Sequence, residues 1–201
     1  MDFITYSHQN ADLVLDTPKI KPLYEELTRV INEIQDAEII NEFNAGTPSK
    51  SLSLAINRIL KKHLEENGWV KEAPIFQDSE YQGIKWRLDF AKDEIAIEVA
   101  FNHGEAIPWN LLKPVLASQL NHVQKAYQAE VGIVICATAE LKEAGNFDNA
   151  VGEFEKFERY FKPLQNVLNA PILLLGLLAP KSFEIEETMD GRRSIGSVKM
   201  K

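Results

Sequence analysis

The sequence predicts an α/β protein in which helices flank a mixed central sheet, and three observations support this fold class. Residues 131–138 (VGIVICAT) and 171–180 (PILLLGLLAP) are continuous apolar runs, as expected of strands buried on both faces of a sheet. Two stretches of alternating polarity, 84–91 and 94–101, indicate a β-hairpin. Helical patterns precede and separate these strands, an order that favours one sheet covered on both sides.

Two amphipathic helices and a loop come before the hairpin. Residues 22–35 place apolar side chains on one helical stripe, namely Leu23, Leu27, Val30, Ile31 and Ile34. The segment 43–51 (FNAGTPSKS) combines Gly, Pro and small polar residues, which predicts a loop. A second helix is expected over 52–69, with Gly68 as its C-cap.

Two further helices are expected after the hairpin, over 107–128 and 150–166, each followed by one of the apolar strands. From about residue 181 the chain is polar and carries a local excess of positive charge, which predicts a short basic tail. No repeat or linker-like segment interrupts the 201 residues, so we expect one domain over 1–201.

Composition excludes several classes of protein. No apolar run reaches the roughly 18 residues that a membrane span needs, and the N-terminal residues lack the pattern of a signal peptide. Cys136 is the only cysteine, which excludes internal disulfides and fits a reducing cytoplasm, where we expect the protein. The net charge of −8 argues against coating of nucleic acid by bulk positive charge. It leaves a site-specific nucleic-acid binder open.

The hairpin carries an acidic residue on each strand, Asp89 and Glu98, on either side of a turn at Lys92-Asp93. A hairpin brings these positions together, and two adjacent carboxylates repel unless a cation neutralises them. Mg²⁺ typically takes one or two protein carboxylates together with waters and substrate phosphate. The alternation also allows a simpler interpretation, in which Glu98 points to solvent on the same face as Ala100. A metal site and a surface pair are therefore both open from these residues alone.

The chain resembles the BglII/BstYI-like type II restriction endonucleases of the PD-(D/E)XK superfamily. Four blocks carry the likeness in the same order: YSHQNADL, NRILKKHLEENGW, DFAKDEIAIEVAFN and APILLLGLLAP. The D-x8-E spacing alone is weakly specific, whereas four co-linear blocks are much more specific. The resemblance implies the restriction-endonuclease-like fold and a homodimer that uses Mg²⁺ to hydrolyse phosphodiester bonds at a short palindrome in double-stranded DNA. Many relatives read GATC-centred sites, and a DNA methyltransferase acts separately beside such enzymes.

The resemblance also assigns roles to residues. It implies that Asp89 and Glu98 are catalytic carboxylates that bind the metal together with the backbone carbonyl of Val99. It further implies that Asn57 helps to hold the catalytic geometry, although an exposed helical residue is the alternative. The DNA-contacting candidates lie in the segment after the second hairpin strand and in the 43–51 loop, and they are Asn102, His103, Lys50 and Ser51. A plain surface loop is the alternative for these residues.

Ala100 departs from the pattern, because relatives carry Lys or Gln at this position. Alanine cannot orient the attacking water or stabilise charge in the transition state. Asn102 or Lys92 could take over this role, or the metal and its waters could suffice at a reduced rate. The chain could also be a catalytically weak DNA-binding dimer of the same fold. We favour an active enzyme with a relocated third residue.

Overall fold

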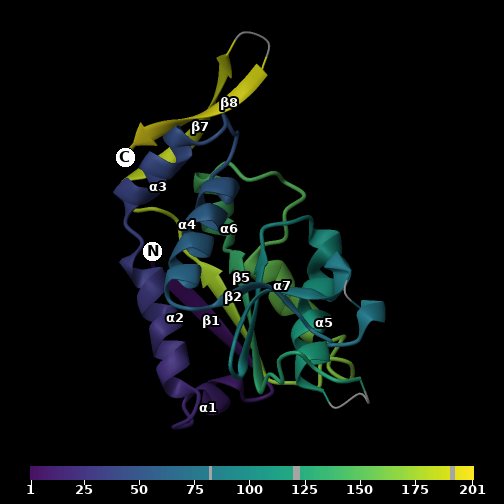
Figure 1. Cartoon of the computed structure of the whole chain (residues 1–201). Coiled ribbons are helices and arrows are strands. Elements are labelled where there is room, and N and C mark those ends of the chain that lie inside the picture. Colours follow the sequence, from purple (N-terminus) through teal and green to yellow (C-terminus); the bar gives the residue numbers. More distant parts are fainter. Residues whose placement is uncertain (82, 120–122, 191–192) are drawn as a thin grey trace.

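The computed structural model describes residues 1–81, 83–119, 123–190 and 193–201, and it confirms the predicted α/β class (Figure 1). A six-stranded mixed sheet has the order β1-β6-β5-β4-β3-β2. Its strands are β1 (Phe3–His8), β2 (Val70–Pro74), β3 (Arg87–Lys92), β4 (Ile95–Ala100), β5 (Val131–Ala137) and β6 (Ile172–Leu177). The α-helices are α1 (Ala11–Leu15), α2 (Lys21–Glu33), α3 (Asp36–Ala45), α4 (Ser53–Glu66), α5 (Ile107–Ser118), α6 (Ala139–Ala144) and α7 (Phe154–Phe161). Short 3-10 turns lie at Ser79–Tyr81, Ile84–Trp86 and Gly104–Ala106.

The centre of the sheet is parallel and its edges are antiparallel. β4, β5 and β6 run in the same direction, whereas β1, β2 and β3 pair antiparallel with their neighbours. Every residue of β5 and of β6 is buried, which explains why both segments are continuously apolar in the sequence. The two predicted buried strands are therefore confirmed.

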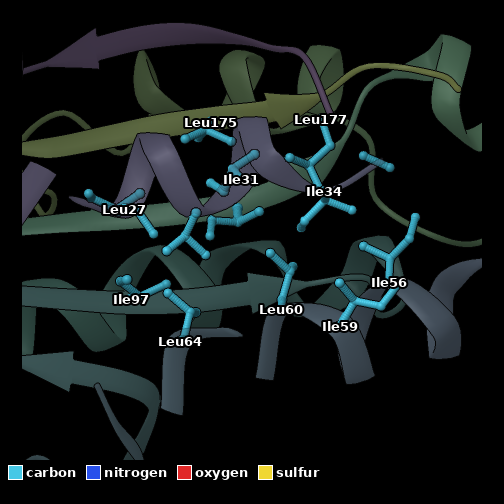
Figure 2. Packing of buried hydrophobic residues seen from close by; sticks show 14 of the residues in the cluster. Leu27, Ile31, Ile34, Ile56, Ile59, Leu60, Leu64, Ile97, Leu175 and Leu177 are labelled. Atoms are coloured by element: carbon cyan, nitrogen blue, oxygen red, sulfur yellow. The ribbon is translucent and has the colours of Figure 1, made fainter. Parts of the chain in front are cut away.

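The two faces of the sheet pack against different sets of helices. One face carries α2 and α4, whose apolar stripes meet alternate residues of the strands in the main core (Figure 2). Figure 2 shows Leu27 and Ile31 of α2 converging with Leu60 and Leu64 of α4 on this face of the sheet. The other face is covered by α5 and α7, which pack on β5 through Val134 and Cys136.

Both helices predicted after the hairpin are shorter in the structure. The helix expected over 107–128 ends at Ser118, where Gln119 turns to an extended conformation. The helix expected over 150–166 is reduced to α7. Val123 and Tyr127, whose spacing suggested a longer helix, lie in a non-helical segment and pack beside β2 and β3. Apolar spacing therefore identified two partly buried residues that pack on the core, but it assigned the wrong backbone conformation to them.

The predicted basic tail is instead a two-stranded antiparallel ribbon of β7 (Phe183–Asp190) and β8 (Arg193–Met200), which projects from the sheet at one end (Figure 1). Phe183 is fully buried in the main core and anchors the ribbon. Lys199 of β8 pairs with Glu184 and Glu186 of β7, so the positive charge of this segment is offset by its own acids. Arg192 lies outside the described residues.

Within the part of the chain that the structure describes, no helix has both the length and the apolar character required to cross a membrane.

Candidate active site

The β3–β4 hairpin brings the two predicted acidic residues to opposing positions. The ladder pairs Lys92 with Ile95 and ends at Phe90 and Ile97, so the turn consists of Asp93 and Glu94. It lies one residue later than predicted, and Asp93 takes the left-handed conformation with φ 46°. This shift matters, because continuing the observed register sets Asp89 opposite Glu98, whereas a turn at 92–93 would have set it opposite Ala96.

Asp89 occupies the gap where the two strands stop pairing. Its Oδ2 accepts a hydrogen bond of 2.6 Å from the backbone N–H of Val99 on β4. The N–H and C=O of one strand residue point toward the same neighbouring strand. The Val99 carbonyl is therefore directed to the side on which Asp89 lies, as its predicted role as a metal ligand requires.

Glu98 is buried, with only 2% of its surface exposed, so the interpretation of this residue as a solvent-facing surface acid is wrong. Its Oε2 accepts a hydrogen bond of 2.6 Å from Nζ of Lys113 on α5. Its Oε1 is buried and has no hydrogen-bond partner among the described residues. A buried polar atom without a partner is rare in folded proteins and calls for an explanation, such as strain, a bound water, a bound ion or a catalytic role.

The electrostatics of the pair reflect this burial. Burial, and then the charge of Asp89, raise the pKa of Glu98 from 4.5 to about 8, although Lys113 acts in the opposite direction. Burial also raises the pKa of Asp89, against the hydrogen bond from Val99 and the charge of Lys113. Lys113 is therefore the lysine whose charge acts on both carboxylates, and their burial still keeps both pKa values raised.

This donor set fits a divalent cation. The unpartnered Oε1 of Glu98, the Asp89 carboxylate and the Val99 carbonyl are hard oxygen ligands of the kind that Mg²⁺ prefers. No cluster of three or more His, Cys, Asp or Glu side chains with metal-binding geometry occurs among the residues described. An incomplete protein shell suits an ion that retains several waters.

A cleft of about 180 Å³ opens beside Asp89. Asn57 and Lys61 of α4 line it together with Lys71 and Glu72 of β2. The structure thus places Asn57 in the cleft beside Asp89, and its role there stays a prediction. The two lysines and Glu72 were not among the predicted site residues, although Lys61 follows Asn57 by one helical turn and so shares its side of the helix.

The predicted DNA-contacting residues lie elsewhere. Asn102 and His103 are exposed just beyond β4, and Oδ1 of Asn102 accepts a hydrogen bond from Asn110 at 2.9 Å. Lys50 pairs with Glu187 of the β7–β8 ribbon at 3.3 Å, and the Ser51 hydroxyl contacts that of Ser53. Lys50 and Ser51 do not line the Asp89 cleft. The DNA-binding roles of all four stay predictions.

Lys92 does not replace the missing residue at position 100. Its Nζ donates to Glu26 at 2.7 Å and to the carbonyl of Asn67 at 2.8 Å, which holds it at the turn end of β3. The cation at the carboxylates is Lys113, which the sequence reasoning missed. The sequence did contain an indication that Lys113 is unusual, because it is the only charged residue in the α5 sequence IPWNLLKPVLAS.

Comparison with solved structures first defines the class. The chain is similar to the restriction endonuclease BglII in complex with a DNA 16-mer, with a TM-score of 0.70, 16% identity and 100% coverage of both chains. It is also similar to free BglII, with a TM-score of 0.60, 18% identity and 100% coverage of both chains. These likenesses establish the fold of a restriction endonuclease.

The family follows from the sequence match. The family model described as restriction endonuclease BglII/BglIII matches residues 3–177, so the chain belongs to this family. It is accordingly a type II site-specific deoxyribonuclease. No curated protein matches the chain.

Proposed function

We propose that this endonuclease hydrolyses phosphodiester bonds in double-stranded DNA at a short palindromic site, with a GATC-centred site as the first candidate, and that it requires Mg²⁺. The observation that carries the proposal is the buried, unpartnered Oε1 of Glu98 beside Asp89 in a chain of this family. The structure of BglII in complex with a DNA 16-mer supports DNA as the partner.

In the proposed reaction, Asp89, Glu98 and the Val99 carbonyl hold the ion. A bound divalent ion would polarise the scissile phosphate and lower the pKa of an attacking water. The burial of Glu98 keeps bulk water from its carboxylate and strengthens electrostatic interactions at that point. Lys61 and Lys71 line the cleft and would attract the DNA backbone, for which Lys71 would exchange its ion pair with Glu65 for a phosphate. Asn57 provides a neutral hydrogen-bonding group in the same cleft.

Cleavage of both strands of a palindrome requires two active sites related by two-fold symmetry, so we propose a homodimer. A cell that contains such an enzyme needs its own copies of the site protected, and a separate DNA methyltransferase would supply this protection. The free and buried thiol of Cys136 is compatible with the reducing cytoplasm that we propose as the location.

The alternative function is a catalytically weak DNA-binding dimer of the same fold. Ala100 favours it, because its buried methyl group offers no hydrogen bond at the position where relatives carry Lys or Gln.

Incubation of the purified protein with plasmid DNA and Mg²⁺ separates the two functions. Discrete fragments that vanish in Asp89→Asn and Glu98→Gln variants support the site-specific nuclease. Retarded but uncut DNA would support the weak binder. A smear of products without discrete bands would indicate a nuclease without sequence specificity, and so contradict the proposal.

A further inference from the structure

Ala100 lies under helix α5, so a long side chain has no place there. Only 2% of the Ala100 surface is exposed, and it packs in one cluster with Ile107 and Leu111 of α5. Overpacking of a core position by a larger side chain forces neighbouring groups to shift. The helix thus fills the space that a Lys or Gln at position 100 would need.

The close approach of α5 to the sheet depends on a glycine of β5. A Cβ atom added at Gly132 would lie 2.2 Å from Cβ of Pro114, far inside van der Waals contact. Gly132 pairs with Ala96 of β4, so two small residues lie side by side beneath the helix. Pro114 packs against these two small residues, and the preceding residue, Lys113, donates a hydrogen bond to Glu98.

We propose that Lys113 is the third polar group of the site: it positions Glu98 by holding Oε2, and so presents Oε1 to the divalent ion. This inference rests on the proposed function and adds a residue to it. Metal-binding carboxylates are commonly held by a further hydrogen bond of this kind, which fixes their orientation. Lys113 also brings to the carboxylates a positive charge that Ala100 cannot supply.

An ordinary structural ion pair does not account for the geometry. A buried pair contributes to stability only when its remaining polar atoms are also satisfied, yet Oε1 of Glu98 is left without a partner among the described residues. The charge of Lys113 also lies near both carboxylates, because Asp89 and Glu98 occupy opposing positions of the hairpin. A lysine that served only to neutralise Glu98 would be displaced by the ion, whereas a positioning lysine stays in contact with Oε2.

A positioning lysine and a lysine that only neutralises Glu98 predict opposite effects of removing Lys113. Loss of a positioning lysine weakens Mg²⁺ binding, whereas loss of a neutralising lysine leaves it unchanged or strengthens it. We would measure Mg²⁺ binding by isothermal titration calorimetry on the protein alone, and single-turnover cleavage of plasmid DNA at saturating Mg²⁺. Lys113→Met is expected to weaken Mg²⁺ binding and slow cleavage, each by about 10 to 100-fold. Lys113→Arg, which keeps the charge and the donor, should recover most of both losses.

Lys142 offers a matched control, because its ion pair with Glu153 is similarly shielded from solvent, with side-chain exposures of 14% and 15%. Lys142→Met should leave Mg²⁺ affinity and cleavage within about threefold of the unmodified protein, whatever it does to stability. Should Lys113→Met fail to fold, Lys113→Ala gives the same comparison, since it also removes both the charge and the hydrogen-bond donor to Glu98.

The possible results distinguish a failure of the positioning role from a failure of the proposed function. A Lys113→Met protein that binds Mg²⁺ as tightly as the unmodified chain, or more tightly, and cleaves at the same rate overturns the positioning role. An unmodified chain that binds Mg²⁺ in a Lys113-dependent manner but cuts no DNA overturns the proposed function and leaves the positioning role standing. An unmodified chain that binds no Mg²⁺ overturns both.

Discussion

Two shielded Lys–Glu pairs in this protein have opposite electrostatic character. Glu153 accepts a hydrogen bond from Lys142 at 2.8 Å and forms an ion pair with Lys156 at 3.1 Å. Burial alone would raise the pKa of Glu153, but these two lysines outweigh it, and the pKa is lowered. Glu98 accepts a hydrogen bond from Lys113, lies opposite the Asp89 carboxylate, and has one oxygen without a partner among the described residues; its pKa is raised to about 8. Glu153 is thus paired with two lysines, whereas Glu98 is paired with Lys113.

This contrast shows how to separate a structural pair from a functional pair. Burial and a short lysine contact are common to both, so neither property identifies the site. We propose that the Glu98 oxygen without a partner among the described residues does, because a folded protein retains an unsatisfied carboxylate against a cost in stability. Substitutions of Glu98 and Glu153 should therefore differ in cleavage rate, in the pH dependence of stability and in stabilisation by Mg²⁺.

The largest contrast should appear in cleavage. Glu98→Gln is expected to lower the single-turnover rate by about 1000-fold or more, because it removes a ligand whose ion supplies several kcal/mol of transition-state stabilisation. Glu153→Gln should change the rate little, since its partners lie on α6 and α7 away from the carboxylate pair. Equal losses in the two variants, measured on the same plasmid, would remove the basis for the distinction.

The next contrast is in the pH dependence of stability without metal. The folded-state pKa of Glu98 is about 8 against an ordinary value of 4.5, so the folded state binds more protons than the unfolded state between these pH values. Stability should therefore fall as pH rises from about 5 to 8, by an amount on the order of a few kcal/mol. Glu98→Gln should flatten this slope in denaturant titrations with a chelator present.

Glu153 should show the opposite sign, because its folded-state pKa is lowered. Its contribution to stability is present above its ordinary pKa and is lost as pH falls through the lowered value. A Glu153→Gln variant should therefore be destabilised at neutral pH and approach the unmodified protein in acid. The same slope change in both variants would contradict the assignment.

A smaller effect is expected from the packing that brings Lys113 to Glu98. Gly132→Ala would force Pro114 away from β5, and we expect a loss of about 1 to 3 kcal/mol in the free energy of unfolding. Cleavage should fall as well, because α5 carries Lys113. Gly83→Ala is the control, since none of the described residues comes within 4 Å of the added Cβ, and it should stay within about 0.5 kcal/mol.

The smallest expected effect is the stabilisation of the folded state by Mg²⁺. At a concentration ten times its dissociation constant, the ion should add about 1.4 kcal/mol to the free energy of unfolding. For a chain of this size that corresponds to a rise of about 3 to 5 °C in melting temperature. Thermal unfolding should show this rise for the unmodified protein and for Glu153→Gln, and little or none for Glu98→Gln. A rise of the same size in Glu98→Gln would exclude Glu98 as a ligand.

Local patterns were sufficient for the centre of the sheet. Continuous apolar runs identified β5 and β6, and the alternation in 94–101 assigned Ile97 and Glu98 to opposite faces of β4. Helices and strands at the periphery of the fold were not predicted, because they bury too few side chains to produce a recognisable apolar pattern. In α3, for example, only Ile39 and Phe43 are buried.

The candidate site was predictable only in part. The opposition of Asp89 and Glu98 follows from a hairpin, which is local, although the turn had to be placed to within one residue. The contact of Lys113 with Glu98 depends on how α5 packs on a third element, β5, at Gly132. No spacing rule within one strand or helix contains that information.

The Glu98–Lys113 contact joins two residues 15 positions apart, one from a strand and one from a helix. A genome survey that requires all three polar residues within the β3–β4 hairpin would pass over this chain or label it inactive. Searches for related enzymes gain from asking which side chain reaches the second acidic residue in space, whatever its position along the polypeptide.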